Sequence, residues 1–213
     1  MSHALWEIIL ARWDEVNGVL DGALPPGTAS GPGVGAAALV QLRSALHGRL
    51  DALERDLVPL VAEPETKRIL FPLVLHLDER VLSRLPRGDK LSWRRLQDDV
   101  LDDEAGGEVF YARLDLLLRL PGIDAQSIVL EVYYFCLADG FHGRFDDQAA
   151  IDAYKRDIQK HLAPSTGLAP AGSGVVPPPP AKARRRRSPA FYYLATAALV
   201  VLIVVVPIVA SNL

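Results

Sequence analysis

The stretch DAQSIVLEVYYFCLADGFHGRF, residues 124–145, indicates the fold class. Its apolar side chains recur at three- and four-residue steps, the period of an α-helix packed against a core, at Ile128, Val132, Phe135 and Cys136. Asp124 can cap the start of this helix, and Gly140 is suited to a left-handed end. The stretch therefore predicts a helix that ends in a glycine-rich turn.

The same period extends outward over most of residues 1–163. It predicts further helices over about 6–20, 39–57, 63–85, 92–100, 110–118 and 146–162. Ser92 and Asp146 are the predicted caps of two of them, and Pro72 is expected to kink or split the third. Because no alternating strand pattern is present, the fold class is all-α, with about seven helices in this domain.

Composition excludes several classes of protein. Of the 213 residues, 50% are hydrophobic and 23% are charged, so wholesale disorder and fibrous repeats are excluded. The single cysteine, Cys136, cannot form an internal disulfide, nor can it alone hold a zinc finger or an iron–sulfur cluster. Residues 1–163 carry 18 Lys and Arg against 26 Asp and Glu, so the first part of the chain is acidic.

Residues 190–210 read AFYYLATAALVVLIVVVPIVA and contain no charge. As a helix they span about 31 Å, close to the thickness of a bilayer core. A buried core helix is the alternative, but such a helix would keep a polar stripe. Residues 190–210 are therefore predicted to form a single transmembrane helix, with 211–213 as a short periplasmic end.

A basic cluster precedes this apolar stretch and consists of Lys182, Arg184, Arg185, Arg186 and Arg187. The positive-inside rule places residues 1–163 in the cytoplasm, and the cluster is predicted to contact anionic lipid headgroups. Its position beside an apolar segment favours this reading over nucleic-acid binding. Residues 164–189 contain seven prolines and three glycines and are predicted to be a linker.

Catalytic motifs are absent: the sequence has no P-loop, no dinucleotide fingerprint and no HExxH or GxSxG. His76, Asp78 and Glu79 could suggest metal ligands, but on a helix His76 and Asp78 point about 200° apart. Cys136 lies in an apolar helix and is expected to pack as a small hydrophobe. A crowded acidic segment is either a solvated face or a docking patch for a basic partner: Asp98, Asp99, Asp102, Asp103 and Glu104.

Three segments together resemble one known family. They are LHLDERVL (75–82), Trp93 with GGEVFYARLDLLL (106–118), and LEVYYFCLADGFHGRF (130–145). These segments are similar to the DotU/IcmH/TssL family, inner-membrane components of type IV and type VI secretion systems. The resemblance covers about residues 5–162. Two positions depart from the family pattern: Phe145, where tyrosine is usual, and Asp139, where small or apolar residues are common.

The resemblance implies two packed helical sub-bundles and no enzymatic activity, cofactor or small-molecule substrate. It implies contact with an IcmF/TssM-type inner-membrane protein and a TssK-type baseplate subunit, and it makes a homodimer plausible. The family-motif residues with structural or interaction roles are Asp78, Glu79, Trp93, Gly107, Glu131, Gly140, Phe141, Gly143 and Arg144. We expect Asp78 or Glu131 to pair with Arg144 or to accept the Trp93 indole N–H.

The sequence thus favours a non-catalytic, membrane-anchored scaffold of a type VI or type IVb secretion system in the bacterial inner membrane. Two alternatives stay open at this point. One is a generic tail-anchored adaptor unrelated to secretion. The other is a membrane-tethered enzyme that uses His76, Asp78 and Glu79.

Overall fold

The computed structural model describes residues 2–101, 106–120 and 124–163, all within the compact unit Met1–Ser165. Within these ranges it contains one 3-10 helix, Thr28–Ser30, and seven α-helices and no strand. The α-helices are α1 (Ser2–Ala23), α2 (Ala36–Leu57), α3 (Glu63–Arg84), α4 (Gln97–Val100), α5 (Gly107–Arg119), α6 (Asp124–Ala138) and α7 (Gln148–Leu162). The all-helical prediction is confirmed.

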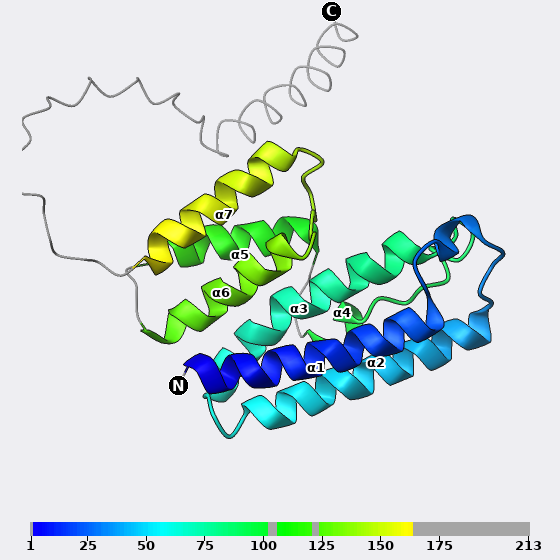
Figure 1. The fold of residues 1–213 in the computed structure, drawn as a ribbon, viewed down its shortest axis with the longest axis horizontal. Coiled ribbons are helices and arrows are strands. Elements are labelled where there is room, and N and C mark those ends of the chain that lie inside the picture. Colours follow the sequence, from blue (N-terminus) through cyan, green and yellow to red (C-terminus); the bar gives the residue numbers. More distant parts are fainter. Residues whose placement is uncertain (1, 102–105, 121–123, 164–213) are drawn as a thin grey trace, which may run out of the picture. The chain divides into compact units, whose positions relative to one another are not determined.

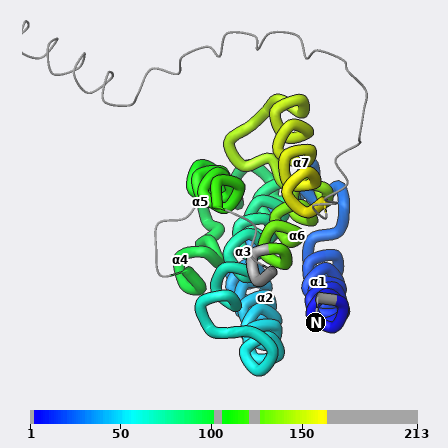
Figure 2. Tube along the Cα trace, turned by 90° about the vertical axis from the view of Figure 1, so that its left-hand side faces the viewer, coloured from blue at the N-terminus to red at the C-terminus, as the bar shows by residue number. Residues whose placement is uncertain are grey.

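The helices form two groups that meet along α3. Helices α1 and α2 pack against each other along their lengths, and α2 packs on α3 (Figure 1). Helix α6 packs on α3 from the other side, and α5 and α7 both pack on α6 (Figure 2). The first group is therefore α1–α2–α3 and the second is α5–α6–α7, with the α3–α6 contact between them.

Helix α3 is buried by both groups, since every residue from Ile69 to Asp78 is buried. This middle stretch of α3 is therefore covered on all faces, and except for His76 and Asp78 its side chains are apolar. Pro72 lies inside it, and the helix continues through this residue without being split. A proline removes one backbone hydrogen bond, and the packing on both sides of α3 compensates for that loss.

Two predicted helix starts are wrong. Ser92 begins no helix, because residues 93–95 are non-helical and α4 covers only Gln97–Val100. The last helix is capped by Asp147 rather than Asp146: the Asp147 side chain accepts a hydrogen bond from the Ala149 backbone N–H at 2.9 Å. Gly140 has a φ of 96° and ends α6 in the left-handed conformation, as predicted.

Within residues 2–101, 106–120 and 124–163, no helix combines the length and the apolar character needed to cross a bilayer. The predicted linker 164–189, the predicted span 190–210 and the end 211–213 lie outside the described residues.

We predict that a chain ending at Ala163 folds without the remaining residues, because the described helices lie within the compact unit Met1–Ser165 and share one buried apolar core. Its far-UV circular dichroism should be helical, and it should unfold in one cooperative thermal transition. The full chain in detergent micelles is the control. A truncated chain without a cooperative transition would contradict the domain boundary.

Candidate functional site

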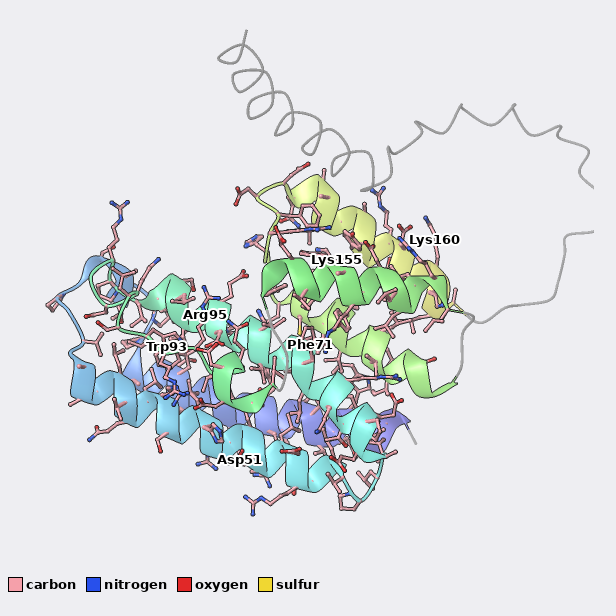
Figure 3. The ribbon with its side chains drawn as sticks, turned by 180° about the vertical axis from the view of Figure 1, so that it is seen from behind. Asp51, Phe71, Trp93, Arg95, Lys155 and Lys160 are labelled. Carbon is pink, nitrogen blue, oxygen red and sulfur yellow. The ribbon has the colours of Figure 1, made fainter. Side chains whose placement is uncertain are left out.

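Asp78 is a carboxylate near the middle of α3 with only 3% of its surface exposed. Its Oδ1 accepts hydrogen bonds from the Trp93 indole at 3.0 Å and from the Leu96 backbone N–H at 2.9 Å. Its Oδ2 accepts the Gln97 backbone N–H at 3.0 Å. All three donors belong to the segment after α3, and Asp78 thus holds this segment against the helix. Trp93 is labelled in Figure 3. The predicted Asp78–Trp93 hydrogen bond is confirmed.

Burial raises the pKa of the Asp78 carboxyl above its usual value. The three hydrogen bonds and the Arg95 charge act in the opposite direction but are smaller effects. An unpaired carboxylate at this depth would be strongly destabilising. Its donors are therefore part of the fold, and its two oxygens are committed to the chain itself.

Glu79 follows Asp78 and points about 100° further round the helix. Its Oε1 accepts the His142 backbone N–H at 2.8 Å, and its Oε2 accepts the Gly143 backbone N–H at 2.7 Å. Both donors lie in the turn that follows α6, which belongs to the second group of helices. Glu79 therefore joins the two groups of helices, because each of its carboxylate oxygens accepts one backbone hydrogen bond from the turn.

Glycine is required where α5 meets the same turn. A Cβ atom on Gly107 would lie 2.6 Å from the carbonyl carbon of Gly143. Gly143 has a φ of 59°, and a Cβ there would lie 2.9 Å from the Phe141 ring. The two backbones can approach this closely only without side chains. The GG motif at 106–107 and the GFHGR motif at 140–144 therefore contact each other, through Gly107 and Gly143.

Aromatic rings fill the space behind the turn. The Phe141 ring centroid is 4.2 Å from that of Phe110, and Phe145 lies 4.5 Å from Tyr111. The Tyr111 hydroxyl donates a hydrogen bond to the His142 carbonyl at 2.9 Å. The Arg144 guanidinium lies 4.8 Å from the centre of the Phe145 ring, a cation–π contact. Phe141 and Phe145, which flank the turn, thus both pack against aromatic rings of α5.

A cleft of about 200 Å³ opens beside these contacts, between α3, the segment around Gln97 and the start of α5. Asp78, Glu79, Gly107 and Gly143 line it. Gln97 is 5% exposed, and its Oε1 has no hydrogen-bond partner among the described residues. The wall of the cleft therefore contains a buried acceptor without a described partner.

Comparison with known protein families gave a match over most of the chain. The family described as type VI secretion system protein DotU matches residues 31–210. This chain belongs to the DotU family. No match was found among curated proteins or among solved structures. The resemblance read from three short segments is confirmed, and the DotU match extends from the loop before α2 through the apolar stretch 190–210.

The expected pairing of Glu131 with Arg144 is wrong for this DotU-family chain. Glu131 faces α1, where it accepts a hydrogen bond from the Trp6 indole. Arg144 instead lies over the aromatic rings of Tyr111 and Phe145. No partner for Trp6 was predicted from the sequence, although the N–H of a part-buried indole needs an acceptor.

Asp139, a departure from the family pattern, takes part in a second network across the junction. Its Oδ2 lies 2.9 Å from the His76 Nε2 and 2.5 Å from an Arg80 guanidinium nitrogen. The hydrogen bond from His76 and the Arg80 charge lower the pKa of the Asp139 carboxyl. The buried His76 ring also stacks on Trp13, with 5.5 Å between centroids. The sequence did not predict this network, since its members are far apart in the chain.

The metal-site hypothesis is not supported by this geometry. His76 contacts Asp139, Asp78 contacts the segment after α3, and Glu79 contacts the turn after α6. The three side chains thus face three different neighbours. The described part of the chain contains no group of three or more metal-ligating side chains.

Of the acidic segment, the structure places only Asp98 and Asp99. Asp98 is exposed, whereas Asp99 pairs with Arg43 of α2 and with Arg94 at 2.8 Å. Asp99 is therefore engaged within the domain. Asp102, Asp103 and Glu104 lie outside the described residues, as do Lys182 and Arg184–Arg187 of the basic cluster.

We predict that Asp78→Asn lowers the free energy of unfolding by about 2–4 kcal/mol. The amide keeps the shape but turns an N–H toward a backbone or indole N–H, which leaves a buried donor without an acceptor. Chemical denaturation measures the change. Asp98→Asn on the surface is the control and should stay within about 0.5 kcal/mol of the wild type. Equal effects of the two variants would refute the role assigned to Asp78.

We predict that Gly107→Ala destabilises the domain by about 1–3 kcal/mol, because the added methyl overlaps the Gly143 backbone. The matched control is Gly48→Ala in α2, where nothing lies within 4 Å of the added Cβ. Alanine there should stabilise by up to about 1 kcal/mol through helix propensity. If both substitutions stabilised the protein, the close approach of α5 to the turn would be wrong.

Proposed function

We propose that this DotU-family protein is a non-catalytic scaffold subunit of a type VI secretion system. The observation that carries the proposal is the saturation of the junction carboxylates. Asp78 and Glu79 accept five hydrogen bonds from the chain's own N–H groups, and Asp139 is engaged by His76 and Arg80. Groups bound in this way hold loops together and are not available as general acids or bases.

The single thiol supports the same view. Cys136 is fully buried in α6, and burial raises the pKa of its thiol well above the usual value. A buried, protonated thiol is a poor nucleophile. The proposal includes no cofactor and no small-molecule substrate. His76, Asp78 and Glu79, on which the enzyme alternative relied, are engaged within the domain.

The proposal places the protein in the bacterial inner membrane. Residues 190–210 would cross the bilayer once, the basic cluster 182–187 would lie at the inner surface, and residues 1–163 would be cytoplasmic. The DotU match includes residues 190–210, which supports the view that this stretch belongs to the working protein. The linker 164–189 would separate the domain from the bilayer, and 211–213 would be periplasmic.

We propose two protein partners, an IcmF/TssM-type inner-membrane protein and a TssK-type baseplate subunit. The first would meet the chain at the membrane, and the second would dock on the cytoplasmic domain. The cleft beside the junction supports such docking, because it is a hollow of about 200 Å³ whose wall includes Gln97, Gly107 and Gly143. Membership of the DotU family leaves no observation in favour of an adaptor unrelated to secretion.

The test is affinity purification of the full chain from native membranes, with mass-spectrometric identification of what co-purifies. We expect IcmF/TssM-type and TssK-type subunits to be enriched with the full chain. A chain ending at Ala163 should lose the first and keep the second. Recovery of the full chain in the soluble fraction, or the absence of every secretion subunit, would refute the proposal.

The variant Gln97→Leu sharpens this test. It removes a buried acceptor without a described partner, so the domain should be as stable as the wild type or slightly more stable. Capture of the TssK-type subunit should nevertheless fall. Gln41→Leu on the exposed face of α2 is the control and should leave capture unchanged. Full capture by Gln97→Leu would exclude the cleft as the contact.

A further inference from the structure

One end of the α1–α2–α3 group carries a concentration of positive charge. Residues 84–95 contain five arginines and lysines and one acid, Asp89, in a domain that is acidic as a whole. Arg84 pairs with Asp21 at 2.5 Å, and Arg94 pairs with Asp99. Arg87 and Lys90 are exposed and form no ion pair with any residue that the structure describes. Arg87 and Lys90 belong to the turn formed by residues 87–91. This end of the domain is therefore locally cationic.

Leu91 protrudes from the same turn with 95% of its surface exposed. The other exposed large apolar side chains of the described residues lie between 42% and 68%. A leucine so fully in water gains nothing for the fold, because it buries no area. It stands directly next to Lys90 and four residues after Arg87.

The turn is fixed rather than loose, so the exposure of Leu91 is imposed by the fold. The Asp89 carboxylate accepts the Val34 backbone N–H at 2.6 Å, which ties the turn to the loop before α2. The Asp89 carbonyl accepts backbone N–H groups of Ser92 at 3.0 Å and Trp93 at 3.2 Å. Trp93 is in turn held by Asp78 (Figure 3). Both ends of the segment around Leu91 are thus anchored.

We propose that this turn, residues 87–91, contacts the anionic surface of the membrane. Leu91 would enter the boundary between headgroups and acyl chains, while Arg87 and Lys90 would lie against lipid phosphates. A bilayer offers an apolar layer beneath a charged one, which matches a leucine flanked by cations. An acidic protein surface would match the cations but would leave the leucine unexplained.

The inference rests on the proposed membrane anchor, which would make a weak contact effective. Two cations and one leucine bind a free vesicle only weakly. A tether turns the contact into an intramolecular one, with a high effective concentration. The 26 residues 164–189 can span at most about 90 Å, whereas α3, with 22 residues, is about 33 Å long. The tether is therefore long enough to let this end of the domain reach the bilayer.

The experiment uses the full chain in lipid nanodiscs. Ser92→Cys, exposed beside Leu91, carries a polarity-sensitive fluorophore, since the buried Cys136 does not react. In discs of phosphatidylglycerol and phosphatidylcholine, we expect a blue-shifted emission and a roughly two- to five-fold lower quenching by acrylamide than in discs of phosphatidylcholine alone. High salt should abolish the difference. A probe indifferent to lipid charge would overturn the inference.

Variants separate the contact from a general effect of charge. Arg87→Glu with Lys90→Glu, and Leu91→Ser alone, should each return the probe to its behaviour in neutral discs. The matched control is Arg55→Glu with Arg119→Glu, which makes the same change of charge at exposed sites elsewhere and should keep the protection. Protection that survives the turn variants would overturn the inference. If a turn variant fails to fold, the lipid and salt dependence of the labelled chain decides.

The outcome distinguishes this inference from the proposed function. A chain that does not co-elute with the discs would refute the anchor itself. A chain that co-elutes but shows no lipid-dependent protection would refute only the contact made by the turn. Protection that appears solely after an acidic protein is added would replace the membrane by a protein partner and would equally overturn the inference.

Discussion

Two neighbouring carboxylates on α3 organise the domain. Asp78 binds the segment that follows the helix, and Glu79 binds the turn that follows α6. Because adjacent residues of a helix point about 100° apart, one short motif can reach two different segments. The first contact completes the α1–α2–α3 group, and the second joins it to α5–α6–α7. The arrangement of the two groups thus depends on a pair of adjacent acids rather than on apolar packing alone.

The sequence predicted the helices where local signals agree and failed where a distant group intervenes. Gly140 ends α6 as its conformational freedom suggests. Ser92 was predicted to cap a helix, but the helix begins only at Gln97, where Asp78 accepts the Leu96 and Gln97 backbone N–H groups. Pro72 was expected to kink or split α3, but the helix is not split there, and the residues around Pro72 are buried. In both cases tertiary contacts outweigh local preference.

The candidate site was only partly visible in the sequence. The Asp78–Trp93 hydrogen bond could be foreseen, because a buried acid and an indole N–H need partners. Glu131 accepts a hydrogen bond from Trp6 and does not pair with Arg144, because its face of α6 meets α1. The periodicity of the sequence does not specify which face that is. The need for glycine at position 107 is likewise invisible along the chain, since it arises from the approach of Gly143.

The burial of α3 on every side has a consequence for the order in which the protein forms during synthesis. Helices α1 and α2 leave the ribosome before α3 and can cover one of its faces. The other face is covered only by α6, which begins forty residues after Arg84, so a nascent chain that stops before Asp124 displays an apolar helix surface. Such surfaces attract chaperones and aggregate readily. Residues 190–210, the most apolar segment of the chain, are translated after every helix of this domain.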